Sequence, residues 1–283
     1  MDIAIVGAGT VGTAVGIAWA GVGHRIVAVA GRQATVSRAA TWLPGVPVLP
    51  IAEAVSDADL VAIGVPDEAL PAVVSTVASA VPRGVDVLHL SGARGLEVLE
   101  PVVEAGARPL AVHPLQTFAD VAGGLEALPG CAVAVTAADD DGFVLGERLA
   151  RDLGGRPFRL PDAQRPLYHA AAVFASNYLV AVSGAAEVLF SHAGVPEALA
   201  AMRPLQEATL ANVHRLGPRA ALTGPAVRGD AGTIDRNLSA IAAADPELLA
   251  PYVALCRAAI MVAGDRLAAP ARPAIEEVLA RWS

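Results

Sequence analysis

Lysine is missing from this 283-residue chain: all 20 of its basic side chains are arginine, and 28 Asp and Glu residues leave a formal net charge of −8. Arginine stays protonated in proteins, so it can bind an anion but is a poor proton donor. Any general acid must therefore be His, Tyr, Cys, Asp or Glu. Since there is no basic cluster, the charge argues against a nucleic acid or an anionic membrane as partner. A small anionic substrate is not excluded.

Long hydrophobic runs and cysteines are also scarce. Hydrophobic residues make up 54% of the chain, yet no uninterrupted apolar run reaches membrane-spanning length. The nearest, 167–190, is broken by His169, Asn177 and Glu187, and we expect it to be a buried helix of a soluble protein. The two cysteines form no C-x-x-C pair, which is typical of isolated thiols in a reducing compartment. The first residues lack the positive charge of a signal peptide, so we expect a cytoplasmic protein.

The chain does have a glycine loop close to its start. An apolar run, Asp2–Val6, leads into G-x-G-x-x-G, and a helical stretch (13–20) and a second strand (25–30) follow. The first glycine permits a tight turn, the second lets backbone approach a pyrophosphate, and the third lets the helix pack on the strand. The free N–H groups of the first helical turn would face the phosphates. This context predicts a dinucleotide site formed by Gly7, Ala8, Gly9, Thr10, Val11 and Gly12.

The end of the second strand indicates which dinucleotide binds. An Asp or Glu there is typical of NAD sites because it holds the ribose 2′-OH, whereas an Arg accommodates the 2′-phosphate of NADP. This chain carries Arg32 and no carboxylate at that position. Arg38 is a second candidate, although it could equally lie on the exposed face of the next helix. The sequence therefore predicts NADP(H).

Strands and helices alternate over the first half of the chain. We expect strands at 2–6, 25–30, 47–49, 59–64, 86–90, 109–112, 131–136 and 156–160, and we expect Asp67 to cap a helix that ends near Val81. This alternation predicts an α/β fold, a doubly wound parallel sheet of the Rossmann type, over residues 1–160. The strand pattern then stops. Helices at 163–193, 196–216, 230–243, 246–263 and 273–282 predict an all-helical domain over residues 161–283.

Ligands of such sheets lie beyond the carboxyl ends of the strands. Several residues follow or end an expected strand, and we therefore expect them to line the cofactor site on the same edge as the glycine loop: Gly64, Val65, Pro66, Ser91 and Gly92. A plain turn is the alternative for Ser91-Gly92. His113 ends a strand on this edge, where it could be a proton donor or a structural histidine bonded to a loop carbonyl.

Three motifs carry a resemblance to a known family: H-P-L-Q-T-F from His113, Y-H-A-A-A-V-F-A-S-N from Tyr168, and L-T-G-P-A-V-R-G-D from Leu222. They are similar to a bacterial family that joins a Rossmann-like domain to a C-terminal domain of unknown function. That family lies within the superfamily of ketopantoate reductase, 6-phosphogluconate and 3-hydroxyacyl dehydrogenases and pyrroline-5-carboxylate reductase. The resemblance covers nearly the whole chain. It implies a nicotinamide cofactor and a homodimer in which Ala-rich helices pack against a second copy.

The resemblance also indicates catalytic residues. Hydroxyacid dehydrogenases of the superfamily hold the substrate oxygen with a Lys and an Asn on the long interdomain helix, and this chain has no Lys. His169 lies in the analogous stretch, with Ser176 and Asn177 two turns further along. His169, or else His113, could donate a proton as hydride arrives, and Asn177 could orient the substrate. The alternative is a buried His and Asn that satisfy one another or the backbone.

A loop near the second domain's centre offers an anion-binding residue. Arg228 could hold a substrate carboxylate with two hydrogen bonds, while Asp230 is typical of a helix N-cap. The other histidines show no ligand spacing, and we expect no metal site.

Together these features predict an NADPH-dependent reductase of a small, carboxylated carbonyl compound. Ketopantoate is the leading substrate by superfamily analogy alone. A cyclic-imine reductase of the pyrroline-5-carboxylate reductase type and an NADP(H)-binding sensor without turnover remain as alternatives. The expected partners are an anionic small molecule and a second copy of the chain, with no nucleic acid and no membrane.

Overall fold

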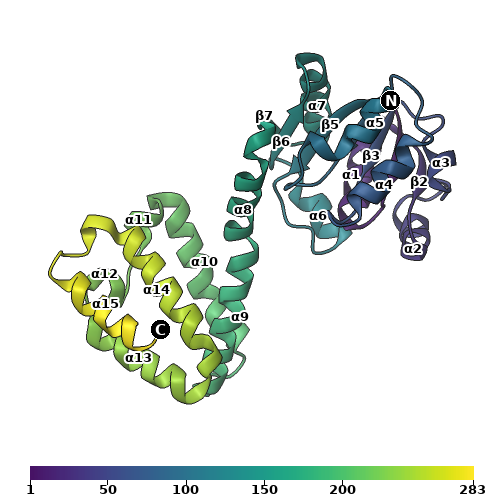
Figure 1. The fold of residues 1–283 in the computed structure, drawn as a ribbon. Coiled ribbons are helices and arrows are strands. Elements are labelled where there is room, and N and C mark those ends of the chain that lie inside the picture. Colours follow the sequence, from purple (N-terminus) through teal and green to yellow (C-terminus); the bar gives the residue numbers. More distant parts are fainter. The chain divides into compact units, whose positions relative to one another are not determined.

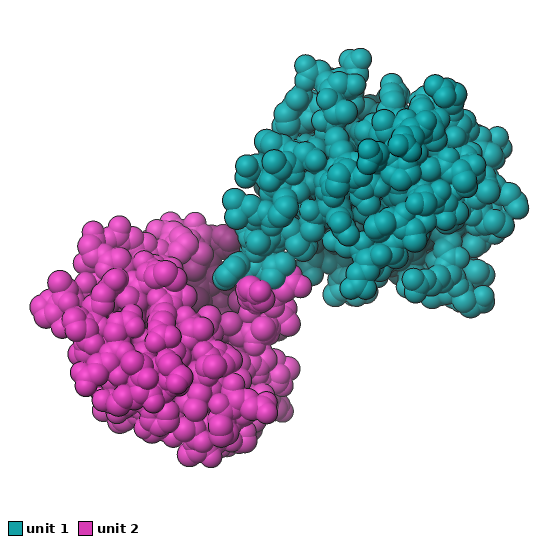
Figure 2. All heavy atoms as spheres, in the orientation of Figure 1, with its two compact units in different colours: residues 1–176 teal, residues 177–283 magenta.

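The computed structural model describes residues 1–283 and divides them into two compact units, Met1–Ser176 and Asn177–Ser283 (Figure 2). The first unit is built around a seven-stranded sheet of order β2-β1-β3-β4-β5-β6-β7 (Figure 1). Its strands are β1 (Asp2–Val6), β2 (Arg25–Ala30), β3 (Leu60–Ile63), β4 (Asp86–His89), β5 (Arg108–Pro114), β6 (Ala132–Ala137) and β7 (Arg156–Arg159). The expected α/β Rossmann-type fold is confirmed.

The sheet is not parallel throughout, and in this the sequence prediction was wrong. Strands β1 to β5 are parallel to one another, but β6 pairs with β5 in the antiparallel sense and β7 is parallel to β6. The segment between β5 and β6 holds only the short α6 (Val121–Ala127) and returns the chain beside β5 in the opposite direction. The weak strand expected at 47–49 is a single bridge from Val48 to Val29.

Helices cover both faces of this sheet, because alternate strand residues point to opposite sides. Ile3 and Ile5 pack with Val15 and Trp19 of α1, whereas Ala4 and its neighbours pack in a second cluster that includes α4. The helices are α1 (Thr10–Gly21), α2 (Gln33–Trp42), α3 (Ile51–Ala54), α4 (Leu70–Ala78), α5 (Glu100–Glu104) and α7 (Asp140–Asp152). Both faces are thus buried, as parallel strands require.

The helix expected to begin at Asp67 begins later. The N-cap of α4 is Ala69, which makes no side-chain hydrogen bond to the first turn, so Asp67 is not the cap. Residues 66–69 instead form a turn, with the amide of Ala69 bonded to the carbonyl of Pro66. Asp67 therefore stays in the loop after β3.

The long helix expected at 163–193 is two helices. Helix α8 (Arg165–Ala175) ends at Ser176, whose φ of −125° and ψ of −68° leave the helical region, and α9 (Asn177–His192) follows. The chain divides into its two compact units between Ser176 and Asn177, whereas the sequence placed the domain boundary at 160/161. Helix α8 belongs with the sheet because its first residue, Arg165, is buried there.

The second unit is all-helical, as expected. It contains α9, α10 (Ala198–Leu216), α11 (Pro218–Ala221), α12 (Pro225–Arg228), α13 (Ala231–Ala244), α14 (Leu249–Ala263) and α15 (Ala271–Arg281). Ile234, Leu238, Ile260 and Ile275 form the centre of its core. The expected N-cap is confirmed: the Asp230 carboxylate accepts a 2.9 Å hydrogen bond from the amide of Thr233 at the start of α13.

Two helical stretches, Asp162–His192 and Pro246–Arg266, are long and apolar enough to cross a membrane by length and composition alone. None of the apolar window of the first is buried within the chain, so the expectation of a buried helix at 167–190 was wrong for a single copy. Leu167 and Val180 are each 70% exposed. Large apolar side chains on α8 and α9 are thus left uncovered.

Candidate cofactor and catalytic site

The glycine loop after β1 turns where only glycine fits. Gly7 has a φ of +88°, and a Cβ there would collide with Cγ1 of Val65 and lie 2.8 Å from the carbonyl oxygen of Gly64. A Cβ on Gly12 would lie 2.5 Å from the carbonyl oxygen of Gly7. These two positions let β1, the start of α1 and the end of β3 approach closely.

The loop leaves the first turn of α1 open to a ligand. Gly9 is the N-cap and has no side chain to accept from the N–H groups of the first turn. Its missing Cβ has one neighbour, the carbonyl oxygen of Gly64 at 3.8 Å, so the space beside it is free. The amides of Thr10, Val11 and Gly12 therefore form the N-terminus of a twelve-residue helix that suits a phosphate.

A cavity of about 390 Å³ lies along this loop. Its walls include six residues of the expected cofactor site: Gly7, Gly9, Arg32, Gly64, Val65 and Pro66. Ala8 is buried behind the wall, where its carbonyl accepts hydrogen bonds from the Thr13 hydroxyl (3.1 Å) and from Nη1 of Arg38 (2.8 Å). The glycine loop and the loop after β3 thus form one continuous binding surface.

Two arginines that follow β2 make one wall of this cavity positively charged. Arg32 is exposed and lines the cavity. Its side chain makes no hydrogen bond or ion pair with the protein, while its backbone is the N-cap of α2. Arg38 also lines the cavity, although the sequence left it on either face of α2. Two guanidinium groups and a free helix N-terminus are suited to a phosphate.

The second part of the site is formed where β4, β5 and α8 meet. A Cβ on Gly92 would lie 2.8 Å from Nε2 of His113 and 3.0 Å from Nδ1 of His169. The two histidines that the sequence offered as rival proton donors therefore both lie beside Gly92. Because the Cβ is absent, both ring nitrogens approach the Ser91-Gly92 turn without a clash.

His113 is held as a neutral imidazole. Its Nδ1 lies 2.7 Å from the hydroxyl of Tyr168, and burial, then the Arg165 cation, then His169, lower the pKa of His113 to about 4. Burial raises the pKa of Tyr168 to about 12, so this phenol keeps its proton. The Tyr168 hydroxyl can donate to Nδ1, which leaves the ring hydrogen of His113 on Nε2, the nitrogen that faces Gly92.

His169 differs because the protein gives it no hydrogen bond. Its Nδ1 is buried and has no partner, although buried polar atoms are nearly always satisfied. This nitrogen lies beside Gly92 and Nε2 of His113. It is therefore free to bond to a ligand.

Two residues to which the sequence assigned no role shape the cluster. His89 at the end of β4 is fully buried, with Nε2 3.0 Å from the carbonyl oxygen of Gly95 and Nδ1 accepting from the Ser91 amide at 3.2 Å. Burial lowers the pKa of His89 to about 4, so it is neutral and structural. Arg165 donates from Nη1 to the carbonyl oxygen of Ser91 at 2.7 Å. The helix-opening position of Arg165 is visible in the sequence, but not the face it buries.

Three expected catalytic residues are not part of this cluster as the structure describes it. Ser176 interrupts the helix and is exposed. Asn177 and Arg228 are exposed residues of the second unit. Their expected contacts with the substrate therefore stay predictions.

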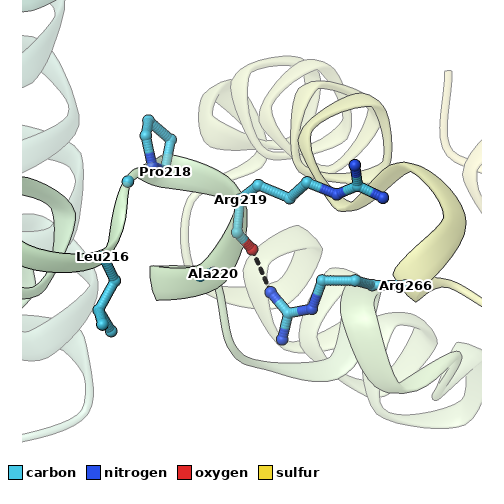
Figure 3. A pocket seen from close by; sticks show the side chains of 6 residues that line it. Leu216, Pro218, Arg219, Ala220 and Arg266 are labelled. Carbon is cyan, nitrogen blue, oxygen red and sulfur yellow. Dashed lines mark hydrogen bonds between the residues drawn. The ribbon is translucent and has the colours of Figure 1, made fainter.

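A second cavity, of about 640 Å³, lies within the second unit (Figure 3). It is lined by Leu216, Gly217, Pro218, Arg219, Ala220 and Arg266. Arg266 donates to the carbonyl oxygens of Arg219 and Leu222, and Arg219 pairs with Asp265. Both cations already have partners in the protein, and no acid, histidine, tyrosine or cysteine lines the cavity, so it offers no candidate general acid.

Two parts of the chain match known protein families. Residues 1–114 match a Rossmann-like domain, and residues 131–259 match DUF2520, a domain of unknown function. No curated protein matches the chain.

Solved structures share the fold. One is a Bacteroides fragilis protein described as an NADP oxidoreductase, at 24% identity and a TM-score of 0.80 over 92% of this chain and 98% of that one. An imine reductase from Myxococcus stipitatus in complex with NADP+ has 15% identity and a TM-score of 0.68 over 100% and 99% of the two chains. A reductive aminase from Aspergillus terreus in complex with NADPH has 19% identity and a TM-score of 0.61 over 99% and 92%.

Proposed function

We propose that this chain, which joins a Rossmann-like domain to a DUF2520 domain, is a cytoplasmic NADPH-dependent oxidoreductase that reduces a small carboxylated carbonyl compound. The observation that carries the proposal is the pair of sites on one edge of the sheet. A phosphate-binding cavity with two arginines follows β1 and β2, and a histidine pair follows β4 and β5. Asp67 follows Pro66 of the cavity wall, and its charge favours the protonated form of His113, which supports the proposal that the two sites are close.

The residues of the cavity fit a dinucleotide. The amides that follow Gly9 would hold the pyrophosphate, and Arg32 with Arg38 would hold the 2′-phosphate. The loop Gly64-Val65-Pro66 and the Ser91-Gly92 turn would flank the nicotinamide. When bound, NADPH would supply a hydride. Two solved complexes of similar fold contain NADP+ or NADPH, which supports this choice of cofactor, whereas a variant imine reductase of similar fold contains NAD+.

The two histidines would then have different roles at the substrate oxygen. We assign the proton donor to His169, because Nδ1 has no partner in the protein. His113 has a pKa of about 4 and carries too little proton at neutral pH to be the acid. Its Nε2–H can still donate a hydrogen bond to the oxygen, as neutral imidazoles do in other enzymes. Asn177 and Arg228 remain candidates to orient the substrate and to bind its carboxylate.

Imine reduction is the second candidate function, and the solved imine reductase and reductive aminase favour it. An imine can be protonated before hydride transfer, so its reduction depends less on an acidic side chain than reduction of a carbonyl compound does. A sensor that binds NADP(H) without turnover is the third.

Oxidation of NADPH by the purified protein separates these proposals. We expect saturable turnover of a 2-keto acid, with ketopantoate included in the panel, and weaker turnover of cyclic imines. Faster turnover of an imine than of any 2-keto acid would assign the enzyme to imine reduction instead. Binding of NADPH without turnover of either class would favour the sensor.

Arg32 provides a test of cofactor choice. Arg32→Gln removes an unpaired exposed cation, so we expect the Kd for NADPH to rise about 10- to 100-fold while the Kd for NADH changes less than about twofold. Fluorescence titration of both cofactors measures this. Arg151→Gln is the matched control, because Arg151 is exposed and bonds to Glu147 on the surface of α7. Equal losses for NADPH and NADH would contradict a role at the 2′-phosphate.

The uncovered apolar face of α8 and α9 supports a second proposal, a homodimer. Val180 and Leu167 are exposed in the single chain, and burial of such side chains favours association. We expect light scattering to give twice the 28.6 kDa chain mass and Val180→Asp to halve it. Glu187→Asp, which keeps the charge on the same helix, is the control. A monomer that partitions into lipid vesicles would contradict the dimer.

A further inference from the structure

Arg165 is a buried cation that forms no ion pair, although the charges of Asp162 and Glu97 favour its protonated form. It is fully inaccessible, and its Nε donates to the Thr136 hydroxyl at 3.0 Å while Nη1 donates to the carbonyl oxygen of Ser91 at 2.7 Å. Nη1 also lies 3.5 Å from the carbonyl oxygen of Gly92. None of these acceptors is charged, and Nη2 is buried with no acceptor at all.

Stability alone does not account for such a residue. A buried charge loses its hydration, and that loss is regained only where an opposite charge and full hydrogen bonding replace the water. Burial accordingly lowers the pKa of Arg165, although an arginine remains protonated at neutral pH. Replacing buried charged groups with apolar residues of similar size often leaves the stability of a fold unchanged or increases it. The role of Arg165 is therefore better inferred from the groups that it contacts.

Those contacts converge on the catalytic turn. Arg165 opens α8, and Tyr168 and His169 lie three and four residues later on the same face. One end of the guanidinium holds Ser91, and the next residue, Gly92, is the one whose missing Cβ admits the two histidine rings. The same side chain thus connects β6, through Thr136, with the turn after β4.

We propose that Arg165 is a positioning residue of the reductase site: it fixes the Ser91-Gly92 turn against His113 and His169. The proposal rests on the proposed function, since it assigns the purpose of this geometry to the substrate oxygen. Arg165 does not touch that oxygen. It acts through the turn and through the histidines.

The charges around His113 make its pKa a measurable test of the proposal. Arg165 and His169 disfavour the protonated form of His113, whereas Asp67 in the loop after β3 favours it. Tyr168, the hydrogen-bond partner, is uncharged below a pH of about 12. Loss of the cation should therefore raise the pKa of His113 from about 4 toward the usual value for histidine.

The pKa of His89, whose ring bonds to the Ser91 amide, also depends on the Arg165 cation. Arg165 and His113 disfavour its protonated form, while Asp67 and a hydrogen bond to the Gly95 carbonyl favour it. Its pKa should rise with that of His113 when the charge is removed.

Two variants separate the charge of Arg165 from its shape. Arg165→Gln removes the charge and keeps a donor, whereas Arg165→Lys keeps the charge and loses the forked geometry. Arg151→Gln on the surface of α7 is the matched control. Histidine side-chain nitrogen signals followed by NMR over pH 3.5 to 8 give the pKa of His113 without any substrate. NADPH titration, kcat and KM are measured on the same samples.

For Arg165→Gln we expect the pKa of His113 to rise by at least about one unit. We expect kcat to fall at least about tenfold and the Kd for NADPH to rise by a smaller factor, because the Ser91-Gly92 turn would also flank the nicotinamide. Arg165→Lys should keep the His113 pKa near that of the original protein and recover part of kcat. If Arg165→Gln does not fold, the Arg165→Lys titration carries the test: a His113 pKa that rises despite the retained charge contradicts the proposal.

Two other results would overturn it. An unchanged His113 titration in Arg165→Gln would show that the cation does not act on the histidines. A Kd for NADPH that rises in step with the fall in kcat would show a general structural role. If the original protein turns over no substrate, the proposed function fails, and the NMR titration still decides whether Arg165 controls His113.

Discussion

Replacing His169 with alanine is expected to lower kcat by about 100- to 1,000-fold, the range typical of a lost general acid. Nδ1 of His169 is buried beside Gly92 and has no acceptor or donor in the protein. The proton it would deliver therefore has no ready substitute among the neighbouring side chains, since His113 has a pKa of about 4 and Tyr168 one of about 12. The Kd for NADPH should stay within about twofold, because the loss falls on the chemical step.

The measurement is steady-state oxidation of NADPH with the substrate identified from the panel, together with a fluorescence titration of NADPH. His214→Ala, an exposed histidine on α10, is the matched control and should keep kcat unchanged. A kcat for His169→Ala within about threefold of the original protein would refute the assignment. His113→Gln in the same assay decides between the two histidines.

We expect His113→Gln to lower kcat less than His169→Ala does, by about tenfold, because it removes one hydrogen bond to the oxygen and no proton. The pH profile gives an independent check. If His113 with its pKa of about 4 were the acid, kcat would fall about tenfold with each pH unit above 5. We expect no such fall between pH 5 and 6.

The second large effect is expected at the glycine loop. Gly7→Ala should weaken NADPH binding by at least about 100-fold, because alanine is strained at a φ of +88° and its Cβ would collide with Val65. The loop can relieve that collision only by moving away from the end of β3. Such a shift would displace the amides at the start of α1 from the pyrophosphate.

Titration with NADPH measures this loss, and circular dichroism checks the fold. Gly21→Ala at the end of α1 is the control, since a Cβ there meets nothing within 4 Å. If Gly7→Ala fails to fold, Gly9→Val serves instead. Gly9 has an ordinary φ of −70° and open space at its Cβ position, so valine would obstruct the ligand and not the fold. Unchanged NADPH binding in the folded variant would place the cofactor elsewhere.

Sequence features with strictly local causes predicted the fold well. The G-x-G-x-x-G loop, the strand that precedes it and Arg32 at the end of β2 all follow from short-range steric and charge rules, and the structure places them along one cavity. The position of His113 at the carboxyl end of β5 follows from strand order in the same way. The meeting of His113 with His169 was not predictable from spacing, because it depends on how α8 packs against the sheet.

Features that depend on tertiary packing were missed. The direction of β6 cannot be read from its apolar residues, because a strand buried in a sheet looks alike in either sense. The break at Ser176 lies in an apolar, Ala-rich stretch without Gly or Pro, and the polar pair Ser176-Asn177 alone did not predict it. Arg165 was missed for another reason: a charged residue in a first helical turn is usually solvated, and only the structure shows this one buried.

The most direct test of the whole account is a calorimetric titration of the purified protein with NADPH and, separately, with NADH. We expect saturable binding of one NADPH per chain and binding of NADH at least about tenfold weaker, because Arg32 and Arg38 line the cavity where the 2′-phosphate would lie. Equal affinity for the two cofactors would contradict the assignment of those arginines. No binding of either would contradict the central claim that this chain is a nicotinamide-dependent oxidoreductase.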